Sequence, residues 1–368
     1  MGSYDMLFSS SILHNGRVLW NTASFQFLAV SLTSGTVLAE LPDLQVSKLS
    51  YRLGEMTSET ATLPWRNLPS NWNEATIPYS TAILLIRGVT VLWGGIVVKR
   101  ARTLSGSGLS LTLATVEHYL DNVHVTDHSY SNRDQCEIVK DLVLTTLKDH
   151  RFAFSVEASP SSIRRDRTYK TSSDKTLLSV LQDLSNVSGG PEWCTSWKVG
   201  NGVYTPVLTV ADRLGSVTPV TTFDESVMTS FRVLEDYTDG YGANSVTAVG
   251  DATDEEQLRS DTMKVDQSYR PVVEYVVRES SSITRKETLD AYASSILEQL
   301  KNGTVTVGMT LSLMAAPILY EEWRPGDVVA WAISDDNGRF DDFDHGEARI
   351  VGYDIDFSGV WTITPIMR

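Results

Sequence analysis

The chain has 368 residues, of which 42% are hydrophobic, enough for two or three domains with hydrophobic cores. Its net charge of -15 excludes a large phosphate-binding surface, because nucleic-acid binding depends on clustered lysine and arginine. The start lacks the pattern of a secretory signal, and no hydrophobic run reaches the length of a membrane span. Cys136 and Cys194 suggest neither a disulfide framework nor a zinc site, so we expect folding in a reducing cytoplasm.

The first 116 residues are dominated by strand patterns. The predicted strands are 25–30, 35–41, 44–53, 83–86, 89–98 and 109–113. A loop rich in proline, tryptophan and asparagine is predicted at 63–78, and the last three strands form an antiparallel meander. This pattern favours a small β-barrel or sandwich at 1–116.

Residues 117–222 change to a mixed pattern. One helical turn is predicted at 117–121, a helix at 132–147 with Asn132 as its cap, and a second helix at about 173–186. Two strands, 193–199 and 203–210, flank a Gly200-Asn201-Gly202 turn that favours a hairpin. We interpret this region as an α+β insert between two β regions.

Strand patterns return at 223–368, together with one strongly predicted helix. The strands are expected at 231–234, 244–249, 272–277, 304–313, 328–333, 348–357 and 360–366. In the helix, 284–302, Thr284 and Glu287 form a capping box and Gly303 follows the end. Its apolar face consists of Leu289, Tyr292, Ala293, Ile296, Leu297 and Leu300, which we expect to pack on a sheet.

The segment Trp323-Arg324-Pro325-Gly326-Asp327-Val328-Val329 is a turn that opens into a strand. We expect Pro325 and Gly326 to form the corner that directs 328–333 into the second β region, with the 284–302 helix packed beside it. Both β regions contain a long strand, a glycine turn and a meander with a central tryptophan. The predicted fold class is therefore α+β, mainly β, with two similar barrels on either side of an α+β insert.

Motifs for catalysis or cofactor binding are missing from the sequence, which has no GxSxG, HExxH or Walker loop. His118, His124 and His128, interleaved with Asp121 and Asp127, could form a metal site or a polar transition from helix to loop. The acidic loop 335–344 could bind calcium, although its Asn-Gly sequence favours a solvated hairpin tip. We assign no catalytic, cofactor or metal residue.

Tryptophans could form a carbohydrate-binding set or pack in the core and at subunit contacts. The eight considered are Trp65, Trp72, Trp93, Trp193, Trp197, Trp323, Trp331 and Trp361. Trp65 and Trp72 lie in the proline-rich loop and are the best candidates for contact with a partner protein.

The order of elements resembles the tail baseplate hub proteins of long-tailed bacteriophages. The residues that carry this resemblance are Leu41-Pro42-Asp43-Leu44, Trp93-Gly94-Gly95-Ile96-Val97 followed by 109–113 and Glu117-His118-Tyr119-Leu120, and Trp323 to Val329 after the capped helix. The resemblance spans nearly the whole chain. It assigns structural roles at the barrel turns to Trp93, Gly94, Gly95, Trp323, Pro325, Gly326 and Asp327.

The resemblance implies two tube-type β-barrel domains, 1–116 and 223–368, flanking the insert at 117–222. It further implies a homotrimer whose six barrels form a pseudo-sixfold ring at the distal end of the tail. Such a ring lines or closes the channel for the tape-measure protein and DNA, and its partners are the distal tail protein, the tail tube and receptor-binding or fibre proteins. Because the chain stops at Arg368, any enzyme or receptor binder is expected to be a separate protein.

Two alternatives remain at this point. A carbohydrate-binding tail or cell-surface module predicts exposed, coplanar tryptophans on one face. A cell-wall hydrolase predicts a cleft in 117–222 that places His118, His124 or His128 beside Asp121 or Asp127.

Overall fold

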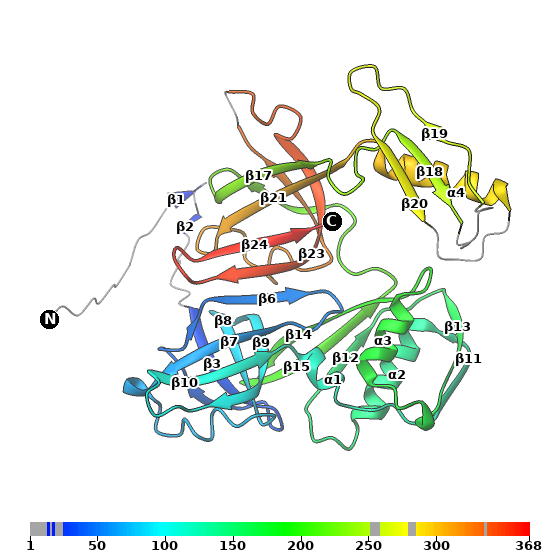
Figure 1. Cartoon of the computed structure of the whole chain (residues 1–368). Coiled ribbons are helices and arrows are strands. Elements are labelled where there is room, and N and C mark those ends of the chain that lie inside the picture. Colours follow the sequence, from blue (N-terminus) through cyan, green and yellow to red (C-terminus); the bar gives the residue numbers. More distant parts are fainter. Residues whose placement is uncertain (1–12, 15–16, 19–24, 251–257, 279–284, 335–336) are drawn as a thin grey trace. The chain divides into compact units, whose positions relative to one another are not determined.

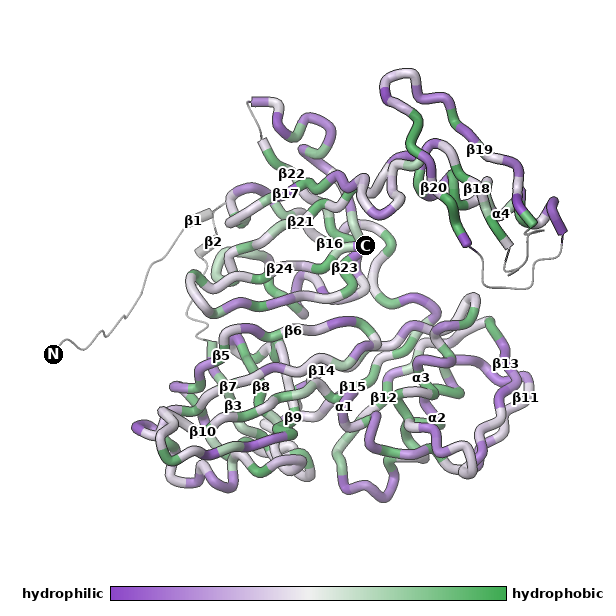
Figure 2. The backbone as a smooth tube through the Cα atoms, viewed as in Figure 1, coloured by the Kyte–Doolittle hydropathy of each residue, from purple (hydrophilic) through white to green (hydrophobic). Residues whose placement is uncertain are grey.

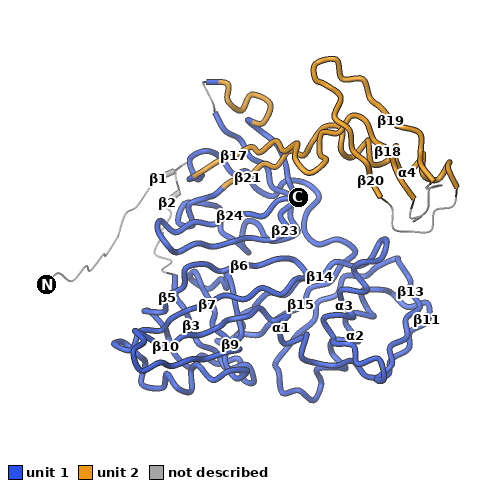
Figure 3. The backbone as a smooth tube through the Cα atoms, in the orientation of Figure 1, with its two compact units in different colours: residues 1–229, 310–337, 344–368 blue, residues 230–309, 338–343 orange. Residues whose placement is uncertain are grey.

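The computed structural model describes residues 13–14, 17–18, 25–250, 258–278, 285–334 and 337–368. The chain divides into two compact units, shown in Figure 3: residues 1–229, 310–337 and 344–368 form the first, and 230–309 and 338–343 form the second. The fold is mainly β with few helices, which confirms the predicted class. Among the described residues, no helix is long and hydrophobic enough to cross a membrane.

An antiparallel sheet of seven strands forms the first β region (Figure 1). Its order is β4-β3-β8-β9-β10-β7-β5. The strands are β3 (Phe25–Ser31), β4 (Val37–Glu40), β5 (Gln45–Val46), β7 (Ser58–Pro64), β8 (Thr81–Arg87), β9 (Thr90–Ala101) and β10 (Gly108–Ala114). Every residue of β8 is buried, because this central strand is covered on both faces, and Figure 2 shows the hydrophobic residues along it. A short hairpin, β1 (Leu13–His14) and β2 (Arg17–Val18), precedes the sheet.

One strand prediction and one loop boundary in this region were wrong. The segment 44–53 is not one strand but two, β5 and β6 (Lys48–Arg52), which belong to different sheets. The chain leaves the first sheet at Ser47, whose carbonyl accepts a hydrogen bond from the amide of Phe357 at 2.8 Å. The start of the predicted loop at 63–78 belongs to β7 and is followed by the short 3-10 turn η1 (Trp65–Asn67).

The region after the first sheet contains three helices and two small sheets. The helices are α1 (Val116–Leu120), α2 (Gln135–Leu147) and α3 (Leu177–Ser185), with a 3-10 turn η2 (Thr171–Ser173) before α3. The sheets are β11 (His128–Asp134) with β13 (Arg164–Tyr169), and β12 (Ser155–Ala158) with β15 (Val203–Ala211) and β14 (Glu192–Gly200). The predicted hairpin β14–β15 is confirmed, with Asn201 and Gly202 at positive φ as the tight turn requires.

The cap predicted for α2 was wrong by two residues. Asp134 caps the helix, since its carboxylate accepts hydrogen bonds from the amides of Cys136 at 2.8 Å and Glu137 at 3.2 Å. Asn132 instead lies within β11 with a φ of 48°. Either residue type is a good cap, so the local sequence could not choose between them.

The helices share one hydrophobic core with the first sheet. This core includes Leu84 of β8, Leu120 of α1, Leu142 of α2, Leu181 of α3 and Leu208 of β15, all fully buried. The sequence pattern changes at residue 117 because helices begin there, while the hydrophobic core continues across that point. The domain boundaries at 116/117 and 222/223 stay predictions.

A second large sheet contains six of the strands after residue 216, in the order β16-β22-β23-β24-β21-β17. They are β16 (Pro219–Asp224), β17 (Met228–Asp236), β21 (Thr304–Ser312), β22 (Val328–Ala332), β23 (His345–Asp356) and β24 (Thr362–Met367). The division into units falls within β17 and β21. Strand β6 of the first region pairs antiparallel with β23, so backbone hydrogen bonds join the two β regions inside the first unit.

The second unit is a small α+β structure. Strand β18 (Ser245–Val249) pairs antiparallel with β19 (Met263–Lys264) and parallel with β20 (Glu274–Arg278). Helix α4 (Lys286–Leu300) packs on this sheet through Leu289, Ala293 and Leu297, which confirms the predicted apolar face.

The predicted capping box of α4 stays a prediction, because one of its two residues is not described. Thr284 lies outside the described residues, and the N-cap is Arg285, whose side chain makes no capping hydrogen bond. Gly303, with a φ of 67°, follows the end of the helix as predicted. Because α4 and the Pro325-Gly326 turn belong to different units, their predicted packing stays a prediction.

Candidate functional site

The Pro325-Gly326 turn lies where the second sheet meets the end of hairpin β14–β15. Gly326 has a φ of 106°, which side chains rarely adopt, and a Cβ atom there would lie 3.0 Å from the backbone of Leu214. The approach is mutual, because a Cβ on Gly215 would lie 2.1 Å from the carbonyl carbon of Gly326. Both glycines therefore permit a close contact between two backbones.

Asp327 holds the turn through its buried carboxylate. One oxygen accepts a hydrogen bond from the amide of Ser216 at 2.8 Å, and the other accepts from the amide of Arg324 at 3.0 Å. The carbonyl of Asp327 accepts from the amide of Ile350 on β23 at 2.8 Å. Asp327 thus joins the start of β22 to the segment around Ser216, which follows β15.

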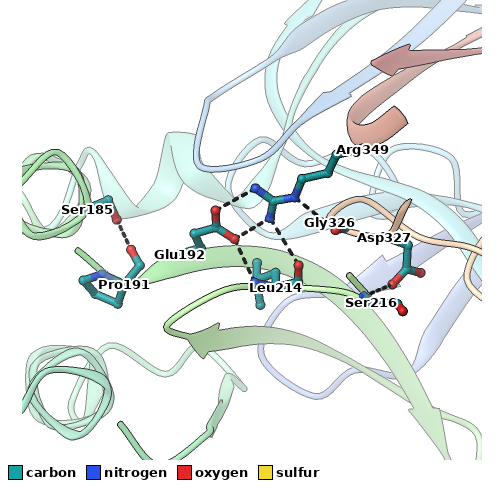
Figure 4. Close-up of polar contacts among 8 residues, drawn as sticks. All are labelled: Ser185, Pro191, Glu192, Leu214, Ser216, Gly326, Asp327 and Arg349. Atoms are coloured by element: carbon teal, nitrogen blue, oxygen red, sulfur yellow. Dashed lines mark hydrogen bonds and ion pairs between the residues drawn. The ribbon is translucent and has the colours of Figure 1, made fainter. Parts of the chain in front are cut away.

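An ion pair between Glu192 and Arg349 reinforces the same junction, as Figure 4 shows. The guanidinium of Arg349 donates to both carboxylate oxygens of Glu192, one at 2.7 Å, and to the carbonyls of Gly326 and Leu214, each at 3.1 Å. The amide of Leu214 donates to Glu192 at 2.7 Å. Partial burial opposes ionisation of Glu192, but the hydrogen bonds from Arg349 and Leu214 outweigh it and hold its pKa below the usual value.

Trp323, at the start of the turn, is a core residue. It is 1% exposed, and its indole nitrogen donates to the carbonyl of Pro317 at 2.9 Å. Its ring packs edge-on against Phe223 of β16, with 5.7 Å between ring centroids, and against Tyr353 of β23, with 6.4 Å. Trp323 therefore anchors the segment before the turn in the second sheet.

Trp93, Gly94 and Gly95 lie inside β9 of the first sheet. The buried indole of Trp93 donates to the carbonyl of Ser50 on β6 at 2.9 Å. Gly94 admits the ring of Trp197, whose indole nitrogen would lie 2.3 Å from a Cβ at that position. A Cβ on Gly95 would lie 2.2 Å from the ring of Trp93. All of these residues fill space and have no reactive group.

A cavity of about 270 Å³ lies beside the junction. Its wall includes Tyr51, Cys194, Trp197, Tyr320 and Pro325. The first β region, hairpin β14–β15 and the turn all contribute to this wall, so the cavity occupies the meeting point of three parts of the first unit.

Burial raises the pKa of two acidic side chains near the cavity. Burial, with nearby Glu117, raises the pKa of the Cys194 thiol to about 12. Burial also raises the pKa of Glu117, against the effect of a 2.6 Å hydrogen bond from the Thr195 hydroxyl. None of the hydrogen bonds of the described residues joins a histidine to either group, so the nucleophile-base pair of a hydrolase is not formed here.

We expect Glu117→Gln to stabilise the protein at neutral pH. The folded-state pKa of Glu117 lies above the unfolded one, so the native side chain loses stability as the pH rises through the folded pKa. A glutamine can keep the hydrogen bond to Thr195 and does not ionise. Chemical unfolding at several pH values should show a gain near neutral pH that disappears below about pH 4, where the glutamate is protonated in both states. A loss of stability at neutral pH would contradict the assignment.

Two of the three histidines of the proposed metal cluster bind different groups. His118 contacts the Tyr79 hydroxyl at 2.9 Å, and His128 contacts the Thr145 hydroxyl at 3.0 Å. Asp121 and Asp127 accept hydrogen bonds from threonines 176 and 171 and from no histidine in the described contacts. The described hydrogen bonds therefore do not join a histidine to either aspartate, as the hydrolase alternative would require.

Clusters of three or more metal-ligating side chains do not occur among the described residues. For the acidic loop, this covers 337–344, since residues 335 and 336 lie outside the described part. Gly338 has a φ of 65°, as expected for a turn.

The eight tryptophans named above do not form an exposed platform. Trp93, Trp193, Trp323 and Trp331 are buried, and of the eight only Trp361 is classed as exposed, at 39%. The carbohydrate-binding alternative requires several coplanar exposed rings, and the described tryptophans do not supply them.

Trp65 and Trp72 are half-buried and pack edge-on, with ring centroids 6.0 Å apart. The indole nitrogen of Trp65 donates to the carbonyl of Gly106 at 2.9 Å, which ties the loop after β7 to the loop between β9 and β10. Contact of Trp65 and Trp72 with a partner stays a prediction.

Sequence reasoning identified the turn but missed the residues that hold it. Glu192 and Arg349 are 157 positions apart and belong to no local motif. The one available signal is Gly215, a glycine at the end of a predicted hairpin.

Comparisons with known proteins show that solved structures share this fold. No protein-family model and no curated protein matches it. Among solved structures, the tail protein from Neisseria meningitidis MC58 is 12% identical with a TM-score of 0.50, and the similarity covers 94% of this chain and 97% of that one. The 43 kDa tail protein of prophage MuSo2 from Shewanella oneidensis is 11% identical with a TM-score of 0.50, covering 94% and 100%. The resemblance to phage tail proteins is thus confirmed at the level of the fold.

Proposed function

We propose that the chain is a structural hub protein at the distal end of a phage tail and has no catalytic activity. Three copies form a ring of six β regions that joins the tail tube to the tip. The ring lines or closes the channel for the tape-measure protein and for DNA, which passes through as cargo. Its partners are the distal tail protein, the tail tube, and receptor-binding or fibre proteins.

The observation that carries this proposal is the fixed pairing of the two β regions within one chain. Strand β6 pairs with β23 over five residues, from Lys48 opposite Asp356 to Arg52 opposite Gly352. On the side-chain level, Asp354 binds Lys48 at 2.9 Å and Arg52 at 2.8 Å. A ring with six similar positions built from three chains needs such a rigid pair in every chain.

The charge of the chain is consistent with the same role. A net charge of -15 makes the surface repel phosphate at most places, so DNA slides past without being held. The core residues at Trp93 and Trp323 supply packing, which is what a ring of β regions requires.

We expect the purified protein to form a trimer, with three times the 40.7 kDa mass of one chain, and electron microscopy to show a hollow threefold ring. Light scattering after size-exclusion chromatography measures the mass. Because a hub can require its neighbour for assembly, the measurement is repeated after mixing with the distal tail protein of the same phage. A monomer without rings in both experiments would overturn the proposal.

A further inference from the structure

The segment 60–116 has the opposite charge balance to the rest of the chain. Residues 60–116 contain five cations, Arg66, Arg87, Lys99, Arg100 and Arg102, and one acid, Glu74, which gives a net charge of +4. The remaining residues contain 26 cations and 45 acids and therefore carry a net charge of -19. A local excess of this size in an acidic chain needs an explanation.

Two loops bring three of these cations to the same end of the sheet. Arg66 lies in η1 beside Trp65, and Arg100 and Arg102 lie at the end of β9 and just beyond it. The guanidinium of Arg102 stacks on the ring of Trp72 at 5.3 Å. We call Trp65, Arg66, Trp72, Arg100 and Arg102 the arginine–tryptophan end.

Hydrogen bonds hold this surface in place. Arg100 donates to the carbonyl of Asn73 at 2.8 Å and to the hydroxyl of Thr76 at 3.1 Å. Together with the bond from Trp65 to Gly106, these contacts fix both loops to each other. The pKa of Arg100 is lowered by desolvation and by repulsion from the nearby Arg102, which agrees with two cations held side by side.

The cations of this end have no acidic partner within the described part of the chain. Arg66 and Arg102 are exposed and Arg100 is half-exposed, and no described ion pair involves any of the three. Glu74, in the same loop, forms no described ion pair with them either. Leu104, at the tip of the loop after β9, is fully exposed and adds a hydrophobic contact point.

We propose that the arginine–tryptophan end binds an acidic segment of a partner protein. A guanidinium stacked on an indole keeps its N–H edge available, and this edge matches a carboxylate with two parallel hydrogen bonds. Half-buried tryptophans and a neighbouring exposed leucine are typical of protein interfaces. Three arginines on a chain that is otherwise strongly acidic are too few to hold nucleic acid, whose binding depends on many phosphate contacts.

This inference rests on the proposed function in one respect: the partner that carries the acidic segment would be another protein of the tail. The two ideas fail separately. A wild-type protein that binds acidic peptide but never forms rings would overturn the hub, while a ring-forming protein that does not bind the peptide would overturn the acidic partner.

The test measures binding of a short, fluorescently labelled oligoglutamate peptide to the full chain by fluorescence anisotropy at low salt. We expect the double variant Arg66→Glu/Arg102→Glu to bind at least about tenfold more weakly, because both charges at the site are reversed. The matched control is Lys148→Glu/Lys264→Glu, which changes the net charge equally at two exposed lysines elsewhere and should weaken binding much less. Thermal unfolding of each variant confirms that it is folded.

A second variant separates charge from geometry. Arg102→Lys keeps the charge but loses the planar group that stacks on Trp72, so we expect a loss of affinity smaller than that of the double reversal. Equal weakening by the double variant and its control would overturn the proposal, and so would a wild-type protein that does not bind the peptide. Tighter binding of a single-stranded oligonucleotide than of the peptide, lost in the same double variant, would assign the surface to nucleic acid and overturn it as well.

Discussion

Gly326→Val is expected to lower the melting temperature by roughly 5–10 °C and to abolish ring assembly. A φ of 106° is strained for any side chain and worst for a β-branched one, which costs about 1–3 kcal/mol. The added atoms also meet the backbone of Leu214, which cannot rotate away as a flexible side chain could. Together these effects lower the unfolding free energy by about 3 kcal/mol. In a unit of this size, each kcal/mol lowers the melting temperature by a few degrees. Differential scanning calorimetry and light scattering measure the two outcomes.

Two further glycines sharpen this experiment. Gly215→Ala introduces its Cβ 2.1 Å from the carbonyl carbon of Gly326, so it should destabilise the same contact from the other side. Gly359, between β23 and β24, is the control, because a Cβ there has no atom within 4 Å and Gly359→Val should change little. Intact trimers of Gly326→Val, with a melting temperature near that of the wild type, would remove the turn from any role in assembly.

Elements with a strong local pattern could be predicted from the sequence. The buried face of α4 follows from apolar residues at helical spacing, and the β14–β15 turn follows from Asn201 and Gly202. The division of 44–53 into β5 and β6 could not be predicted, because its alternating pattern fits one strand and the change of sheet depends on β23, about 300 residues away. Local sequence also could not decide between Asn132 and Asp134 as the cap of α2.

The candidate site was only half predictable for the same reason. Pro325, Gly326 and Asp327 form a recognisable turn, and Trp93 and Trp323 read as core residues. The partners that give the turn its position, Glu192 and Arg349, are polar residues in ordinary strands, and only the fold brings them together. Long-range polar contacts leave no periodic trace in a sequence.

Arg349→Ala is expected to cost about 2–3 kcal/mol, the second large effect at this junction. The substitution removes the cation that pairs with the half-buried carboxylate of Glu192. It also removes the hydrogen bonds that Arg349 donates to the carbonyls of Gly326 and Leu214. Glu192→Gln should cost less, about 1 kcal/mol, because the amide oxygen can still accept from Leu214. Urea unfolding of both variants and of the double variant gives the coupling between the two side chains.

The pH dependence of the same variants tests whether the ion pair acts through charge. The folded-state pKa of Glu192 lies below its unfolded value, so its stabilisation is present above the unfolded pKa, about 4.3, and is lost as the pH falls through the folded pKa. The difference in unfolding free energy between wild type and Glu192→Gln should therefore be constant from about pH 6 to 8 and shrink below about pH 4. In the Arg349→Ala background the effect of Glu192→Gln should lose most of this pH dependence. If the difference stayed unchanged down to about pH 2, packing and not charge would hold the insert to the turn.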